Sequence, residues 1–321
     1  MTRRRAQSDG RRTWWIVGIT AFVLVDIGLV WWAVGGVGRG VDTSAEALPL
    51  SSFAPAPTPR PASARATPTP TPTPDPIVLA AMARRIVPID ATRAWRTASV
   101  GCPGGASIEW SEDAGASWTA WSAGDDVAGV GDIVAFGDGN TVGIIAALAG
   151  DCRQEYRMSF TGGEFWAAYP GEQPDTPIIE PTAGTALVVA AGAVASPCGP
   201  ISEYAVGSGV AVLCTSTALA IAAADLSGWT TARPDGAAVA VTNLGDGYLV
   251  ASRRAAGCVD GLRFATVDAA GAVSEGPCLA AAGDEATSVE LGTAPDGSVW
   301  MWLGDRVAVS GDGGASWAGL G

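Results

Sequence analysis

The chain contains no histidine and no lysine, so all of its basic side chains are arginines. The lack of histidine excludes a Ser-His-Asp triad, a histidine general base and a histidine-ligated metal site. Acidic residues outnumber arginines by 32 to 19, and the formal net charge is −13. We expect neither a cofactor nor a metal ion. Asp138-Gly139-Asn140 and Asp312-Gly313-Gly314 look like fragments of a calcium loop, but neither continues into the twelve-residue pattern.

The charge is distributed unevenly along the chain. Residues 1–40 carry a net charge of +4 (six Arg, two Asp), and residues 41–76 carry −1 (two Arg, three acids). Residues 77–321 carry −16 (11 Arg, 27 acids). A domain this acidic repels phosphate backbones, so nucleic acid is not expected as a partner.

An apolar run near the N-terminus has the length of a membrane span. It extends from Trp14 to Val34, about 21 residues, with tryptophan pairs at both ends and arginines before it. We predict a cytoplasmic basic tail at 1–12 and an uncleaved transmembrane signal anchor at 13–38. The protein would then be a single-pass cell-membrane protein with an extracytoplasmic C-terminal domain. A cleaved signal peptide is the alternative, although its apolar core would be shorter. Asp26 could pair with another membrane helix or simply be tolerated.

A proline-rich segment follows the predicted anchor. Residues 49–76 hold ten prolines among Ala, Thr and Ser. Because proline cannot donate to a strand ladder, this stretch is interpreted as an extended spacer with a reach of about 80 Å. It belongs to a predicted extracytoplasmic linker at 39–76. The folded domain is expected at 77–321.

Short β-type runs alternate with Gly and Asp turns through this domain, and a turn motif recurs. Two segments share the pattern S-x-D-x-G-x-S-W: Ser111, Asp113, Gly115, Ser117 and Trp118, and then Ser310, Asp312, Gly314, Ser316 and Trp317. A partial copy keeps Ser159, Thr161, Gly163 and Trp166 at the same spacing. The Asp and Ser side chains can bond turn amides, the Gly can supply a positive φ, and the Trp can pack between sheets.

This pattern resembles the Asp-box, or BNR repeat, of the sialidase-like β-propellers. The resemblance implies an all-β propeller in which the motif joins the third and fourth strands of a blade. Its anchor positions, Trp118, Trp166, Trp229, Val273 and Trp317, lie 48, 63, 44 and 44 residues apart. A four-stranded blade takes about 40–50 residues. We therefore predict five four-stranded blades with an insertion near 170–198. Six are possible if Leu187-Val188-Val189 in the insertion forms a strand.

Six cysteines in an exported chain indicate a disulfide framework. In the repeat register, Cys102, Cys152, Cys214 and Cys258 fall near the links between second and third strands, while Cys198 and Cys278 precede the following first strand. Both kinds of link belong to the rim opposite the motif turns. We predict the pairs Cys102–Cys152, Cys198–Cys214 and Cys258–Cys278.

Loops held by disulfides suit recognition, so the same rim is the predicted ligand site. Its candidate residues are Asp125, Asp126, Arg153, Tyr156, Arg253, Arg254 and Asp260. An ordinary solvated rim is the competing interpretation.

The favoured function is a non-catalytic binding or scaffold module for a glycan or protein of the cell envelope. The alternative is a sialidase-like or other glycoside hydrolase on the same propeller. The sialidase resemblance implies a Tyr nucleophile paired with Glu, a nearby acid Asp, three arginines that clamp the substrate and a Phe/Tyr-Arg-Ile-Pro motif. Here Arg85-Ile86-Val87-Pro88 carries an extra residue, and no Tyr shows a partner pattern. An opposed Tyr/Glu or Glu/Asp pair in a central pocket lined by several arginines would favour the enzyme.

Overall fold

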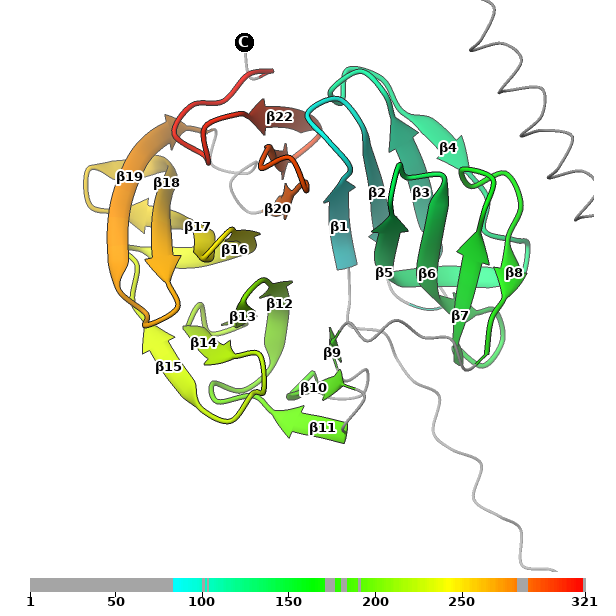
Figure 1. Ribbon diagram of the computed structural model, residues 1–321, viewed down its shortest axis with the longest axis horizontal. Coiled ribbons are helices and arrows are strands. Elements are labelled where there is room, and N and C mark those ends of the chain that lie inside the picture. Colours follow the sequence, from blue (N-terminus) through cyan, green and yellow to red (C-terminus); the bar gives the residue numbers. More distant parts are fainter. Residues whose placement is uncertain are drawn as a thin grey trace, which may run out of the picture. The chain divides into compact units, whose positions relative to one another are not determined.

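The computed structural model describes residues 83–99, 102, 104–170, 177–179, 184–189, 192–281 and 288–319. These residues form six antiparallel β-sheets arranged radially, a six-bladed β-propeller, and they include no helix (Figure 1). The propeller lies within the compact unit Thr71–Gly321. The predicted tail, anchor and linker lie outside the described residues. Within the part described, no helical segment has the length and hydropathy of a membrane span.

Each blade is built from strands that follow one another in sequence. Blade 1 holds β1 (Ala83–Pro88), β2 (Ala94–Ser99), β3 (Ala106–Ser111) and β4 (Thr119–Trp121). Blade 2 holds β5 (Val127–Phe136), β6 (Thr141–Leu148), β7 (Gln154–Ser159) and β8 (Ala167–Ala168). Blade 3 holds β9 (Ile178–Ile179), β10 (Ala186–Val189) and β11 (Gly192–Ala195). Blade 4 holds β12 (Ile201–Val206), β13 (Gly209–Cys214), β14 (Leu219–Ala223) and β15 (Trp229–Ala232). Blade 5 holds β16 (Ala237–Leu244), β17 (Gly247–Ala255), β18 (Cys258–Asp268) and β19 (Val273–Ala280), and blade 6 holds β20 (Val289–Thr293), β21 (Val299–Leu303) and β22 (Arg306–Ser310).

The prediction of five blades is wrong, because the expected insertion is itself a blade. Its central strand is β10, which contains Leu187, Val188 and Val189 and pairs with β11 on one side and β9 on the other. This blade has three strands in the described residues and no copy of the turn motif. A blade count based on the motif therefore missed blade 3. The spacing of 63 residues, from Trp166 to Trp229, is longer than the others because it runs from blade 2 across blade 3 to blade 4.

The motif turns have the contacts that their residue types predict. In blade 6, the Asp312 carboxylate accepts hydrogen bonds from the Ser316 amide at 2.8 Å and the Ser316 hydroxyl at 2.6 Å. The buried Ser310 hydroxyl oxygen accepts from the Gly314 amide at 2.8 Å, and Gly314 has a φ of +91°. Asp113, Ser117 and Ser111 repeat these bonds in blade 1. The turns lie between the third strand and the fourth strand or, in blade 6, the bridge from Val309 to Ala318.

Each motif turn also contacts the preceding blade. A Cβ atom on Gly314 would lie 2.7 Å from the Leu249 side chain of blade 5, so only glycine fits there without a shift. The Trp317 ring lies 4.9 Å from the ring of Phe264, also in blade 5. In blade 1, the Trp118 ring meets Trp300 of blade 6 edge-on at 6.5 Å. The motif therefore closes a hairpin and seals an interface between blades.

The core consists of apolar layers between neighbouring blades. Along β21, Trp300 and Trp302 pack with Ile86 of blade 1, while Met301 faces Leu249 of blade 5. This alternation follows from the two-residue period of a strand. Trp300 and Trp302 therefore share one face of β21.

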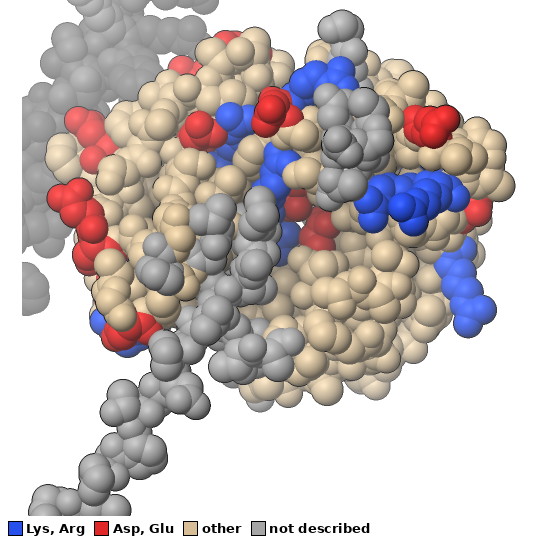
Figure 2. Space-filling view, turned by 180° about the vertical axis from the view of Figure 1, so that it is seen from behind, with Lys and Arg blue, Asp and Glu red and all other residues tan. Residues whose placement is uncertain are grey.

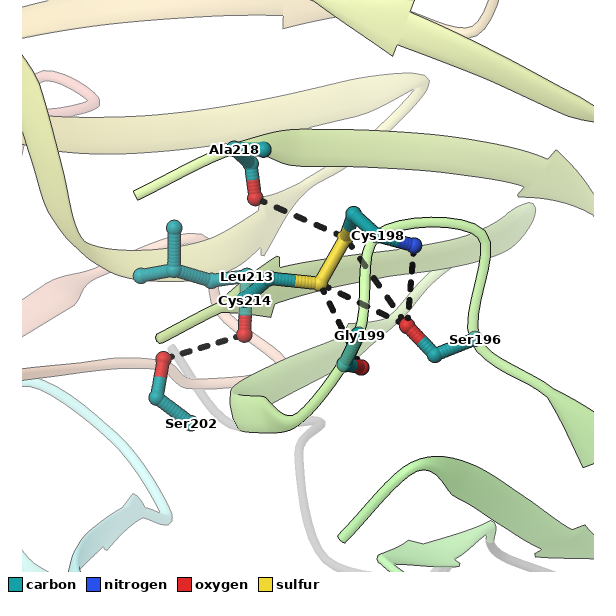
Figure 3. The surroundings of a disulfide bond; sticks show 7 residues. All are labelled: Ser196, Cys198, Gly199, Ser202, Leu213, Cys214 and Ala218. Atoms are coloured by element: carbon teal, nitrogen blue, oxygen red, sulfur yellow. Dashed lines mark hydrogen bonds between the residues drawn. A yellow bond between two sulfur atoms is a disulfide. The ribbon is translucent and has the colours of Figure 1, made fainter. Parts of the chain in front are cut away.

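All three predicted disulfides are present, and Figure 3 shows one of them. Cys102–Cys152 joins the β2–β3 link of blade 1 to the β6–β7 link of blade 2. Cys198–Cys214 ties the connection into blade 4 to the end of β13, and the Ser196 hydroxyl accepts a bond from the Cys198 amide. Cys258–Cys278 joins β18 to β19. The links that carry them lie at the strand ends opposite the motif turns.

Side chains close the ring where the two ends of the propeller meet. Blade 1 is formed wholly by the first described strands and blade 6 by the last, with no exchange of strands between them. Arg84 of blade 1 lies over the Trp302 ring at 3.7 Å and donates to the Gly304 carbonyl at 2.6 Å and to Ser288. Arg96 of blade 1 also lies over the Trp302 ring, at 4.7 Å. This seam depends on cation–π contacts and on hydrogen bonds.

Candidate functional site

A pocket with a few charged side chains lies among the innermost strands of the propeller. It has a volume of about 270 Å³ and is lined by residues of β1, β5, β12, β16 and β20. Figure 2 shows acidic and basic side chains inside a hollow near the centre of the face turned to the viewer. A concave site with a few convergent polar groups is the usual form of a ligand pocket. This pocket is the candidate functional site.

One arginine forms the centre of the charged cluster. The Arg85 guanidinium lies 3.1 Å from Oε1 of Glu290 and 3.5 Å from Oδ1 of Asp132. Burial alone would lower the pKa of Arg85, but the two carboxylates outweigh it and hold the pKa above its usual value. Arg85 is therefore charged and already has two anionic partners.

Tyr204 extends this cluster on the opposite side of Asp132. Its hydroxyl donates to Oδ2 of Asp132 at 2.6 Å, and the Arg85 guanidinium lies 5.1 Å from the centre of its ring. Burial and the neighbouring Asp132 carboxylate raise the pKa of Tyr204 well above its usual value. Tyr204 therefore stays protonated. Its hydrogen-bond partner is Asp132, whereas the sialidase resemblance implies a tyrosine paired with a glutamate.

Two glutamates in the pocket are buried, and their carboxylates accept few hydrogen bonds from the described residues. Glu203 is 4% exposed, and among the described residues its carboxylate accepts one hydrogen bond, from the Val241 amide to Oε1 at 3.2 Å. Glu290 is 6% exposed, and its Oε1 accepts from Arg85. Burial raises the pKa of both groups, for Glu290 to about 7, and the Glu290 charge also raises the pKa of Glu203. Glu290 can therefore exchange a proton near neutral pH.

The charges that line the pocket are mainly negative. Among the described residues of its lining, Arg85 is the one basic side chain, against the three acids Asp132, Glu203 and Glu290. The three-arginine clamp that the sialidase resemblance implies is not formed by the described residues that line the pocket, and Tyr204 is bonded to Asp132. The arrangement therefore suits a ligand that donates hydrogen bonds or carries positive charge.

The predicted rim residues fall into two groups in different blades. Asp125 and Asp126 precede β5, and Arg153 precedes β7, so these three lie at blade 2 near the Cys102–Cys152 bridge. The Asp126 carboxylate forms an ion pair with Arg157, whose Nη1 donates to Oδ1 at 2.8 Å. The Arg153 side chain is 61% exposed.

The second group lies in blade 5. Arg253 and Arg254 end β17, and Asp260 is in β18. Blades 2 and 5 lie apart in the ring, so the predicted residues do not form one site (Figure 1). Tyr156 is 3% exposed and packed against Gly143 within blade 2, so it is not a surface residue of the rim.

Sequence reasoning missed the central site, although a signal was present. Glu203 shares the buried face of its strand with Ile201 and Ala205, and Glu290 lies between buried apolar residues of β20. A charged residue at a position that the strand pattern assigns to the core is a pointer to function. Arg85 was noted only for its place near the Ile-Val-Pro segment.

Metal binding finds no support in the described part of the chain. Three or more acidic or cysteine side chains do not converge there in a way that could hold an ion. In the Asp138-Gly139-Asn140 fragment, the Asp138 carboxylate accepts from the Asn140 amide at 3.0 Å and from its side chain at 2.7 Å. These contacts are those of an ordinary turn.

Comparison with known proteins finds likeness in fold alone. No family model matches the chain, and no curated protein matches its sequence. YCF48 bound to D1 peptide aligns over 78% of this chain and 83% of that chain, with 15% identity and a TM-score of 0.40. SapL1 lectin in complex with alpha methyl fucoside aligns over 77% and 98%, with 12% identity and a TM-score of 0.44. AofleA from Arthrobotrys oligospora aligns over 76% and 86%, with 12% identity and a TM-score of 0.43. At these scores the likenesses carry no argument about what this chain binds.

Proposed function

We propose that this chain is a membrane-tethered, extracytoplasmic propeller of the Asp-box type that binds a glycan of the cell envelope in its central pocket. The observation that carries the proposal is the buried cluster of Arg85, Tyr204, Asp132, Glu203 and Glu290 around one pocket. Buried charges are costly, and they persist where the surroundings hold them or a ligand uses them.

The rest of the chain supports this assignment. The predicted anchor and proline-rich linker would hold the domain at a distance from the membrane, where wall polymers lie. The net charge of −16 on residues 77–321 disfavours nucleic acid and anionic lipid surfaces as partners. Recognition of a polar, uncharged or cationic polymer agrees with the acidic lining of the pocket.

A second candidate function is glycoside hydrolysis. It is favoured by one observation, the pKa of Glu290 near 7 beside further acids in the same pocket. A glycosidase pairs a protonated carboxylic acid with an ionised carboxylate. Sialic acid is a poor fit as its substrate, because Arg85 is already bonded to two carboxylates.

The binding proposal is tested with the full-length chain in lipid nanodiscs. Sedimentation with purified cell-wall polysaccharide measures binding of the wild type and of the Tyr204→Phe and Asp132→Asn variants. We expect each variant to bind about tenfold more weakly or worse. Glu112→Gln is the matched control, since Glu112 is exposed and the change removes one negative charge, as Asp132→Asn does.

Two results would overturn the central pocket as the site: no binding by the wild type, or unchanged binding by both pocket variants. If Arg153→Ala loses binding and the pocket variants do not, the ligand site lies on the rim. Incubation with a panel of aryl glycosides, including sialosides, separates the two functions. Release of the aryl group by the wild type but not by Glu290→Gln would establish the hydrolase.

A further inference from the structure

We propose that the central pocket takes an amino sugar, with its protonated amine held between Glu203 and Glu290. This inference rests on the proposed function and specifies its ligand. The starting observation is that each glutamate is at least nine-tenths buried and lines the pocket. No oxygen of either glutamate is a fully buried atom without a partner, so an oxygen that lacks a protein donor is open to the pocket. A ligand in the pocket can supply that donor.

Both glutamates have such an oxygen. Within the described residues, Glu203 accepts from the Val241 amide at Oε1, and Glu290 accepts from Arg85 at its own Oε1. No described group donates to the Oε2 atom of either residue. The two side chains come from β12 and β20, which flank β16, and their charges repel each other. A cation between them would satisfy both oxygens and remove the repulsion.

The charge balance excludes the opposite choice, a carboxylated sugar. Arg85 is the one basic side chain among the residues that line the pocket, and Asp132 and Glu290 already bind it. One basic side chain thus stands against three acidic ones, Asp132, Glu203 and Glu290, among the described residues of the lining. An anionic ligand would thus meet net negative charge without a free positive partner. The site selects against anions and for ligands that bring donors.

The size and the remaining lining favour a sugar over a lysine side chain. Clefts for drug-sized ligands measure about 300–1,000 Å³, and this pocket, at about 270 Å³, has room for one small ring. Thr242 and Thr293 also line the pocket, with their hydroxyls in contact at 3.0 Å and Thr293 donating to the Asn243 carbonyl at 2.6 Å. Apolar side chains such as Ile86 and Leu291 make up much of the remaining lining. This mixed lining suits a sugar ring, which has both hydroxyls and apolar faces, whereas the stem of lysine has no hydroxyl.

The test compares ligands that differ at one group. Full-length protein in nanodiscs is titrated with a glucosamine oligomer and with its N-acetylated counterpart, at a pH below the pKa of the sugar amine. The acetylated oligomer is the matched control because it keeps every hydroxyl and loses the charge. We expect it to bind about tenfold more weakly, and a sialylated oligosaccharide of similar length to bind more weakly still.

Variants locate the effect in the pocket. Glu203→Gln and Glu290→Gln are expected to abolish the preference for the free amine while binding of the acetylated oligomer changes little. Glu112→Gln, on the surface, should leave the preference intact, and near-ultraviolet circular dichroism checks that each variant is folded.

The outcomes separate the two proposals. Equal binding of the free and acetylated oligomers would refute the amine assignment and leave glycan binding standing. Binding of a lysine-containing peptide, with the same dependence on both glutamates and no binding of either oligomer, would refute the sugar. Failure of every oligosaccharide and of wall polysaccharide to bind would refute the proposed function itself.

Discussion

The protonation of Glu290 makes stability depend on pH in a defined direction. In the unfolded chain its pKa is 4.5, and in the folded protein burial raises the pKa to about 7. Between these two values the folded protein holds a proton that the unfolded chain has released. The free energy of unfolding therefore falls as the pH rises from about 4.5 to about 7, and this contribution is constant above that range.

The size of the effect follows from the two pKa values. A rise from 4.5 to about 7 corresponds to about 3 kcal/mol of unfolding free energy lost across this range. Glutamine has nearly the shape of the protonated glutamate and cannot ionise. Glu290→Gln should therefore match the wild type below pH 4.5 and be more stable by up to about 3 kcal/mol at pH 8. Because Glu203 interacts with Glu290, the double variant with Glu203→Gln should show the flattest curve.

The measurement is urea unfolding of the full-length chain, followed by tryptophan fluorescence at several pH values between 4 and 8. Glu112→Gln, an exposed position in the first motif turn, is the control for the loss of one negative charge. The reasoning is refuted if Glu290→Gln is less stable than the wild type at pH 8. It is also refuted if the difference between the two grows as the pH falls.

Three further predictions concern what holds the propeller together. Replacing both Cys198 and Cys214 by serine opens a loop between residues 16 positions apart. We expect the free energy of unfolding, measured in urea without reductant, to fall by about 3 kcal/mol. An unchanged urea midpoint would contradict this. Ser310→Ala leaves the Gly314 amide without its acceptor and should cost about 1–2 kcal/mol, clearly more than Ser316→Ala at the exposed end of the same turn. Arg84→Met keeps an apolar stem over Trp302 but loses the cation and two hydrogen bonds to carbonyls. We expect the free energy of unfolding, followed by thermal denaturation, to fall by about 1–2 kcal/mol. Equal melting temperatures would show that the seam does not depend on Arg84.

Features encoded in a few consecutive residues were accessible from the sequence. The bonds within the motif turn join Ser310 to Gly314 and Asp312 to Ser316, four positions apart in each case, so no distant residue is needed to recognise the turn. The turns then set a register for the blades, and this register placed all six cysteines at the right strand ends. The disulfide pairs followed because both the strands within a blade and the blades around the ring succeed one another in sequence.

The error in blade count has the same physical origin. Blade 3 lacks the motif turn and the outer strand in the described residues, and β9 contains two residues. Such short strands carry little pattern of their own. They are defined by pairing with β10 and by packing of Leu187 against the blade 4 residues Ile201 and Val212.

The amino-acid sequence by itself determined the all-β class, the hairpin turns, the disulfide pairs and the blades that carry the motif, because each depends on local chemistry repeated along the chain. Only the tertiary structure decided the sixth blade and the central site. Arg85, Asp132, Glu203 and Glu290 stand on four different blades, up to 205 positions apart. Ring closure brings them to one axis, and the pKa values that give the pocket its character arise from the burial and mutual charge that closure creates.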